Sequence, residues 1–205
     1  VSLQFMVNNE IVENVGQLQG SGVFNYGTGQ TITATVYPGY DWIGWFEGEN
    51  KIADSSSFNY VIVDEDKLFT AKLQEKSEMS IFKFSSSMYG CSIDGFKSTI
   101  DKSTVTELVF PEYVTHISAF DNESSYWPNV TSISVSHNNK NYSSVNNCLL
   151  SKDGKTLYMG CKNSVIPNTV ETIGYLAFLG CSNLTEITIP NSVKYIKRGA
   201  FGDCS

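Results

Sequence analysis

The feature that most constrains the fold is a stretch that occurs twice, at residues 165–182 and 188–205, with an offset of 23 residues. Nine of the eighteen aligned positions are identical, and most of these positions are apolar. A repeat of this length forms one coil, and a lone coil leaves its apolar row in water until a neighbouring coil covers it. The repeat therefore predicts stacked coils with a core of recurring residues: Ile166, Val170, Ile173, Phe178 and Cys181, then Ile189, Val193, Ile196, Phe201 and Cys204.

A second pattern lies at the start of the second copy. It consists of Leu184-x-x-Ile187-x-Ile189, the strand signature of a leucine-rich repeat, and Pro190 follows at once. This combination resembles the BspA-like, surface-antigen class of leucine-rich repeats. The resemblance implies a curved solenoid with a parallel sheet on one face, found mainly in secreted or cell-surface proteins of bacteria and some protozoa.

Two earlier segments, 130–135 and 108–111, are interpreted as degenerate copies of the same strand. In the earliest copy the pair Ala119-Phe120 arrives two residues early. Residues 121–127 there replace the expected Gly-Cys turn with a longer, aromatic one. The repeats are therefore predicted to cover about 104–205, with an irregular first coil.

Two hairpins are predicted within this repeat domain, which we assign to residues 77–205. An insertion at about 137–162 contains an Asp-Gly pair between two short apolar runs, and such a pair favours a tight hairpin turn. Residues at about 79–103 alternate between apolar and polar, which predicts a hairpin that covers the first coil. Terminal coils require such a cap, because their apolar face has no neighbour.

Residues 1–76 have a different texture, with alternating strand-like runs separated by Gly, Pro, Ser and Asp turns. The order of landmarks, above all Gly-Tyr-x-Trp-x-Gly-Trp at 39–45 and Thr-Ala-Lys at 70–72, resembles the B-repeat of the internalin family. That resemblance implies a small β-grasp-like module that spaces or displays its neighbours. The chain as a whole is predicted to be mainly β, with this domain followed by a short leucine-rich-repeat solenoid.

Acidic side chains outnumber basic ones by 21 to 14, and residues 1–76 hold ten acidic against four basic. Residues 77–205 are close to balanced, with eleven against ten, and Arg198 is the single arginine. A nucleic-acid or anionic-membrane binder carries a basic cluster that this sequence lacks. No apolar stretch approaches the roughly 20 residues of a transmembrane helix. We therefore expect neither a nucleic-acid partner nor membrane insertion within the chain.

The five cysteines are an odd number, and Cys181 and Cys204 occupy the same position of successive coils. Side chains that point in parallel have the wrong torsion for a disulfide, so free packing thiols are favoured. Cys148 and Cys161 flank the inserted hairpin, and a bridge between them in an oxidising compartment stays open as an alternative. No C-x-x-C or Cys/His cluster occurs, so neither a metal site nor a cofactor is predicted.

Candidate catalytic groups are few. The two histidines are His116, in a polar slot of a strand, and His137, in an Asn-rich loop, and both are interpreted as exposed residues rather than bases. The acidic run at 64–66 lies between two strand-like runs, where a solvated turn is favoured over a calcium loop. An enzyme would need a deep pocket that holds one histidine beside a carboxylate. We predict no catalytic residue.

The remaining functional hypothesis is binding of another molecule by strand residues that face away from the core. The hypothesis is a non-catalytic, extracellular or cell-surface binding module for adhesion to a protein or glycan on a host or neighbouring cell. The alternative is a structural spacer or display segment of a longer cell-wall-attached protein, and in both cases we expect the export signal and anchor to lie outside this sequence. The predicted binding surface consists of Val109, Trp127, Ser132, Ser134, Glu186 and Thr188.

Overall fold

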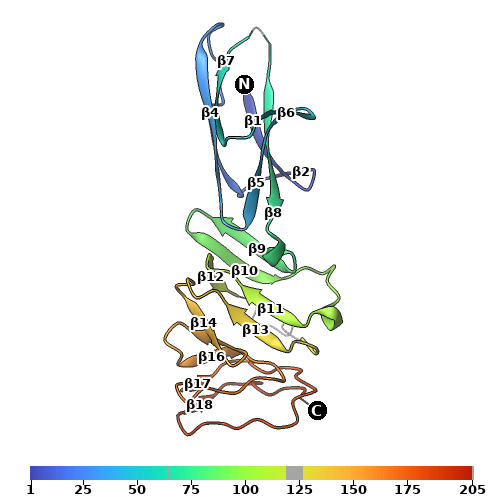
Figure 1. The fold of residues 1–205 in the computed structure, drawn as a ribbon, viewed down its shortest axis with the longest axis vertical. Helices are drawn as coiled ribbons and strands as arrows, with labels where there is room; N and C mark the ends of the chain where they lie inside the picture. The colour runs from blue at the N-terminus through green and yellow to red at the C-terminus, as the bar shows by residue number, and fades with distance from the viewer. Residues whose placement is uncertain (64, 119–126, 205) are drawn as a thin grey trace. The chain divides into compact units, whose positions relative to one another are not determined.

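The computed structural model describes residues 1–63, 65–118 and 127–204. Most of its regular structure is β, and the last coils are largely irregular between short strands. Within those residues the helical segments are two short 3-10 turns, η1 (Ser77–Met79) and η2 (Lys102–Thr104). Figure 1 shows strands along the whole of this part. The prediction of a mainly β protein is therefore confirmed.

The first compact unit comprises residues 1–80 and 85–90. It is built from β1 (Ser2–Val7), β2 (Glu10–Val12), β3 (Gly16–Gln19), β4 (Gly29–Val36), β5 (Tyr40–Glu47), β6 (Asn50–Ala53), β7 (Ser57–Val61) and β8 (Leu68–Glu75). One sheet has the order β2-β1-β8-β5-β6, in which β1 and β8 are parallel and the other neighbours antiparallel. The other is the antiparallel sheet β3-β4-β7.

The core of the first unit forms from the alternate residues of these strands. In β8, Phe69, Ala71 and Leu73 are buried in one apolar cluster, as period-2 alternation requires. Trp45 of β5 joins this cluster and is fully buried, and its indole Nε1 donates a hydrogen bond to the Ser56 carbonyl at 3.2 Å. The aromatic residues of this segment therefore stabilise the domain from inside.

The second unit comprises residues 81–84 and 91–205, so the hairpin of β9 and β10 is shared between the units. Its strands are β9 (Phe82–Ser87), β10 (Gly90–Phe96), β11 (Glu107–Phe110), β12 (Val114–Ile117), β13 (Ser132–Val135), β14 (Tyr142–Val145), β15 (Cys148–Ser151), β16 (Thr156–Met159), β17 (Thr172–Ile173) and β18 (Tyr195–Ile196). They form the sheets β12-β10-β9, β11-β13 and β14-β15-β16-β17-β18. The last of these has an antiparallel half, β14 to β16, and a parallel half, β16 to β18.

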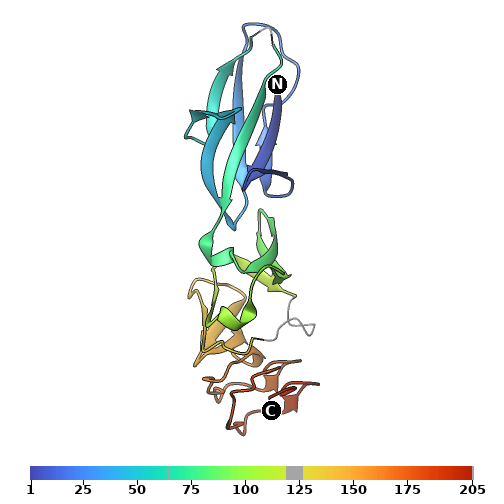
Figure 2. The same cartoon turned by 90° about the vertical axis from the view of Figure 1, so that its right-hand side faces the viewer.

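Backbone hydrogen bonds join the two sequence copies as adjacent coils. The amide of Lys194 donates to the Glu171 carbonyl at 2.8 Å, and the amide of Phe178 donates to the Ala200 carbonyl at 2.7 Å. Partners in both bonds are about one repeat length apart in the sequence, so the coils stack in register. The parallel strands β17 and β18 lie in successive layers in Figures 1 and 2.

The position of the strand differs from the prediction. Residues 184–189, which carry the leucine-rich-repeat signature, are irregular, and the strands of the last two coils lie after the prolines, in β17 and β18. A strand requires a hydrogen-bonded partner, and no backbone hydrogen bond joins 185–189 to another described residue. The apolar signature therefore marks packing positions here rather than a strand.

Equivalent residues of the two sequence copies differ in burial. Ile173 is fully buried, whereas its counterpart Ile196 is 51% exposed, and Ile189 is exposed as well. The apolar row of a coil is closed by the next coil, and in the described residues the second copy has a neighbour on one side only. Ile189 and Ile196 are therefore not core residues in this structure, and the remaining second-copy positions are half-buried: Val193, Phe201 and Cys204. All five first-copy residues are buried: Ile166, Val170, Ile173, Phe178 and Cys181.

The inserted segment forms a three-stranded meander. The Asp-Gly turn connects β15 to β16, with the Gly154 amide donating to the Ser151 carbonyl at 2.9 Å, so the predicted hairpin is present. Strand β14 was not predicted from the sequence; it is joined to β15 through Asn146 and Asn147. Both asparagines have positive φ, 50° and 58°, as a two-residue hairpin turn of type I′ requires.

Candidate binding surface

Strands β11 and β13 bring predicted surface residues together. Leu108 lies opposite Ile133 and both are buried, so their sequence neighbours face outward. Val109 lies opposite Ser134 and is 42% exposed, and Ser132 is partly exposed beside them. The structure thus groups Val109, Ser132 and Ser134 in one patch, here called the ledge.

The other predicted surface residues do not extend this patch. Glu186 and Thr188 are exposed, but they lie in the irregular segment of the last coil rather than in the sheet of the ledge. Trp127 is buried, with its ring edge-on to Phe96 at a centroid distance of 4.3 Å. An indole that packs inside the unit cannot serve as a surface contact, so Trp127 is removed from the binding surface. Residues 119–126, which include the Ala119-Phe120 pair, lie outside the described residues.

A buried asparagine joins the coil of β11 and β12 to the coil of β13. Asn139 is fully buried, and its Nδ2 donates to the carbonyls of Pro111 at 2.8 Å and Val114 at 2.9 Å. Its Oδ1 accepts from the amides of Asn141 at 2.9 Å and Tyr142 at 2.8 Å. Every hydrogen-bonding group of the amide is used, as burial demands. Asn139 was not among the residues predicted from the sequence, where its one visible signal is the Asn-rich loop.

Charged side chains alternate along three successive layers of the last sheet. Glu171 accepts from Lys155 at 3.0 Å and from Lys194 at 2.7 Å, and we call this trio the ionic ladder. The pKa of Glu171 is lowered, first by its hydrogen bond with Lys194 and then by that with Lys155. The ladder places unlike charges opposite each other only when the coils are in the observed register.

The histidines and the acidic run singled out in the sequence do not come together in the described residues. His116 and His137 are both exposed, as predicted from the sequence. No group of three or more His, Cys, Asp or Glu side chains in the described ranges is placed to hold a metal ion. Of the acidic run at 64–66, Asp64 lies outside the described residues.

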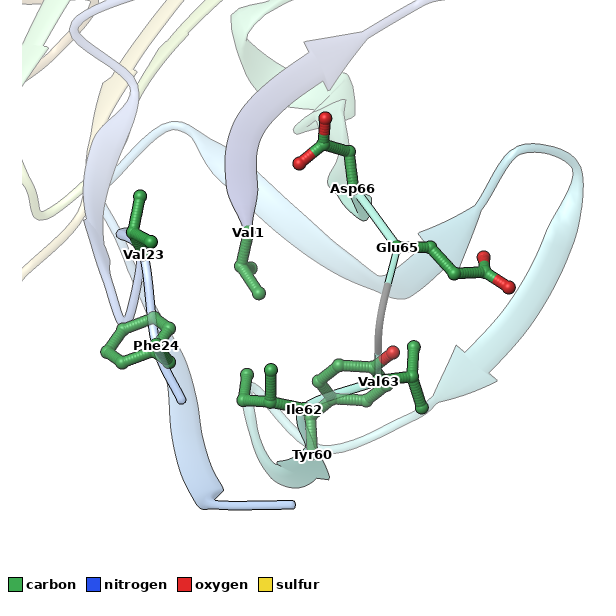
Figure 3. Close-up of a pocket in the computed structure, with 8 residues that line it drawn as sticks. All are labelled: Val1, Val23, Phe24, Tyr60, Ile62, Val63, Glu65 and Asp66. Carbon is green, nitrogen blue, oxygen red and sulfur yellow. The ribbon is translucent and has the colours of Figure 1, made fainter. Parts of the chain in front are cut away.

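A cavity of about 390 Å³ opens in the first unit, and its lining combines apolar side chains with the carboxylates of Glu65 and Asp66. Figure 3 shows the side chains of Val1, Phe24 and Ile62 around it, with the carboxylate of Glu65 directed away from the cavity. That carboxylate pairs with Lys67 at 2.8 Å, and this hydrogen bond lowers the pKa of Glu65. A carboxylate with a lowered pKa is a weaker proton acceptor, so Glu65 is poorly suited to act as a general base.

All five cysteines are free thiols, and four of them are buried. Burial raises the pKa of Cys148 to about 11 and that of Cys181 to about 12. Burial also raises the pKa of Cys204, which is half-buried. Because the thiolate is the reactive form, these thiols are poor nucleophiles near neutral pH.

We expect the native chain, purified without reductant, to react slowly with Ellman's reagent at about pH 8, with Cys204 first because it is the most accessible. In denaturant the same sample should release five equivalents of chromophore, one for each free thiol. Peptide mapping of the labelled sites identifies the order of reaction. A count of three in denaturant, with Cys148 and Cys161 unlabelled, would establish the disulfide alternative instead.

The repeat region is similar in sequence to known proteins. Residues 154–205 match the family described as "BspA type Leucine rich repeat region (6 copies)". A leucine-rich repeat protein of known structure from Eubacterium ventriosum ATCC 27560 is 33% identical, with a TM-score of 0.42, over 48% of this chain and 27% of that one. The pneumococcal vaccine antigen PcpA is 19% identical, with a TM-score of 0.43, over 49% of this chain and 25% of that one.

This chain thus spans about a quarter of the length of each of those two proteins. Among curated proteins none matches it. The described residues contain no helix with the length and apolar character that crossing a membrane demands. Repeats of the matched family are typical of protein-interaction modules. The residues matched, 154–205, are those in which stacked coils recur with the repeat length, so the resemblance of this part of the chain to BspA-type leucine-rich repeats is confirmed.

Proposed function

We propose that the chain is a non-catalytic binding segment of an extracellular or cell-surface protein, and that it adheres to a protein or glycan on a host or neighbouring cell. The observation that carries this proposal is the ledge. Val109 and Ser134 lie side by side on parallel strands, with their sequence neighbours Leu108 and Ile133 anchored in the core. The three ledge residues are uncharged, and the exposed Glu107, opposite Ser132, places one negative charge beside them. A patch of this kind on paired strands can lie against a partner surface.

The ledge has low conformational freedom before binding. Serine and valine have few rotamers to lose, and residues on paired strands are already ordered. Asn139 adds rigidity, because its side chain ties the turn before β12 to the loop after β13. A preorganised surface loses less entropy on association, which favours binding even where the contact area is small.

For the first unit, we propose the role of a spacing or display domain, with the domain boundary near residue 76. Its buried aromatic residues serve the core, and Glu65 at the cavity of Figure 3 is paired with Lys67 and points away from the cavity. Several copies of the binding segment on one cell would raise the strength of attachment through multivalency. A single ledge contact therefore needs only modest affinity.

The experiment that tests the binding function displays the full chain on multivalent beads and measures attachment to epithelial cells, matrix proteins and a glycan panel. Val109→Arg is expected to reduce attachment about tenfold, because it places a charge in the centre of the ledge. Val61→Arg is the matched control, since Val61 is an exposed valine of the first unit, on β7. Attachment that both variants reduce equally, or no attachment to any surface, would overturn the ledge as a binding site.

A further inference from the structure

The near balance of charge in residues 77–205 conceals a change of sign within this domain. Residues 152–205 hold six basic and four acidic side chains, whereas residues 1–151 hold eight basic and seventeen acidic. The last coils therefore carry a net positive charge in an otherwise acidic protein. An anionic partner is repelled by most of the chain and attracted here.

The two sequence copies share their core residues but differ on the surface around the last strand. Thr172 and Tyr195 are paired neighbours on β17 and β18, and two positions further on the first copy has Gly174 where the second has Lys197. The second copy has Arg198 at the next position. Gly174 is buried against the preceding coil, where an added Cβ would clash with the Leu157 carbonyl, whereas Lys197 is exposed. The aromatic and basic side chains of the second copy therefore lie on the surface.

In the last coil, Tyr195 is 61% exposed, and the Nζ atom of Lys197 lies 5.6 Å from its ring centroid. Lys197 and Arg198 are exposed and form no ion pair with any described residue. Lys194 differs, because its charge is used by Glu171 in the ionic ladder. Lys197, beside the exposed Tyr195 ring, and the exposed Arg198 are thus both left available to a ligand.

The preceding coil adds a second aromatic ring. Tyr175 and Arg198 occupy equivalent positions of the two copies, 23 residues apart. The coils are in contact there, since the amide of Leu176 donates to the Arg198 carbonyl at 3.4 Å. Tyr175 is 40% exposed. We call these four residues the cationic tyrosine surface: Tyr175, Tyr195, Lys197 and Arg198.

We propose that the cationic tyrosine surface binds an anionic polysaccharide, a chain of sugars that carries carboxylate or sulfate groups. Exposed tyrosine rings offer an apolar face with a polar hydroxyl, which matches the C–H face and hydroxyl groups of a sugar ring. The guanidinium of Arg198 can form paired hydrogen bonds with a carboxylate or sulfate, and the ammonium of Lys197 adds a point charge. This inference rests on the proposed binding function and names the ligand class for one of its surfaces.

An acidic peptide would use the two cations but would leave the two rings without a matching partner. A neutral polysaccharide would use the rings and leave the cations unused. The alternation of ring and cation over two adjacent coils favours a ligand that combines both properties along its length. Ionic contacts at an exposed surface weaken with salt, so binding is expected to fall as ionic strength rises above about 0.15 M.

The test measures affinity of the 205-residue chain for heparin and polygalacturonate, with dextran as the neutral probe and polyglutamate as the acidic peptide, by biolayer interferometry. The double variant Lys197→Gln/Arg198→Gln should weaken polysaccharide binding about tenfold or more, since two charge-assisted contacts are lost. Lys140→Gln/Lys162→Gln removes the same charge from exposed lysines elsewhere and should change affinity less than about twofold. Tyr195→Ala, which keeps the charge, should weaken binding about threefold or more.

Each alternative outcome counts against the proposal. Equal losses of affinity in Lys197→Gln/Arg198→Gln and Lys140→Gln/Lys162→Gln would indicate general charge attraction. Equal affinity for polyglutamate and the polysaccharides would indicate an acidic peptide site. An unchanged affinity in Tyr195→Ala would remove the aromatic contact. If the beads attach to cells while neither polysaccharide binds, this inference fails and the proposed function stands. If a polysaccharide binds while no cell or matrix surface does, the inference stands without the proposed adhesive role.

Discussion

Replacement of Phe178 with alanine is expected to lower the free energy of unfolding of the second unit by about 3–5 kcal/mol. The ring is fully buried and stacks on Phe201, with centroids 5.1 Å apart and planes inclined by 8°. On its other side it fills the space over Gly160, where an added Cβ would clash with the ring. Removal of the ring leaves a cavity between coils. Hydrogen exchange of peptides from the last two coils, measured with increasing denaturant, reports the loss.

Gly160→Ala provides the matched test of that packing. Alone it should also destabilise the unit, by about 1–3 kcal/mol, because the buried ring has little room to move. Combined with Phe178→Ala it should cost much less, since the new methyl group then enters the cavity. Phe201→Ala should have a smaller effect than Phe178→Ala because Phe201 is half-buried. Additive losses in the Gly160 and Phe178 pair would contradict this account of the coil contact.

Substitution of Asn139 by leucine is expected to destabilise the second unit by about 3 kcal/mol or more, since partners are left unsatisfied in the interior. Two carbonyls and two amides lose their hydrogen bonds to its side chain. Asn139→Asp keeps both acceptor contacts but loses both donor contacts, and it introduces a buried charge. The aspartate variant should recover part of its stability as the pH falls, because the protonated carboxyl group is neutral and can donate once. Thermal unfolding followed by circular dichroism across the acid range measures both effects.

The neighbouring Asn138 supplies the control for that prediction. It is exposed, and Asn138→Leu should change stability by less than about 0.5 kcal/mol. A loss of less than about 1 kcal/mol for Asn139→Leu would show that the four hydrogen bonds are replaced by water. A pH-independent deficit in Asn139→Asp would argue against the buried carboxylate.

The sequence allowed prediction of which residues recur, because apolar spacing is a local property of the chain. It did not allow prediction of which recurring residues are buried. Ile173 and Ile196 occupy the same position of two copies, yet one is fully buried and the other 51% exposed. The difference comes from the neighbouring coil, which covers one copy and not the other. The strand positions were wrong at 184–189 for the same reason, since strand pairing depends on a partner.

The candidate binding surfaces were also predictable from the sequence only in part. Alternation alone placed Val109, Ser132 and Ser134 on the outward side of two strands, and the structure groups them as the ledge. Asn139 escaped prediction because adjacent asparagines look alike in sequence while one alone turns inward. The basic residues near the last strand were visible as sequence, but the distinction between the paired Lys194 and the available Lys197 is a matter of geometry.

The ionic ladder makes the repeat domain sensitive to the loss of a coil. Its signs alternate from layer to layer, as Lys155, Glu171 and Lys194. Loss of the single coil that contains Glu171 would bring two lysines into neighbouring layers, with repulsion in place of attraction. Deletion of that coil is therefore expected to cost slightly more than its lost packing alone, because two attractive ion pairs become one repulsive contact.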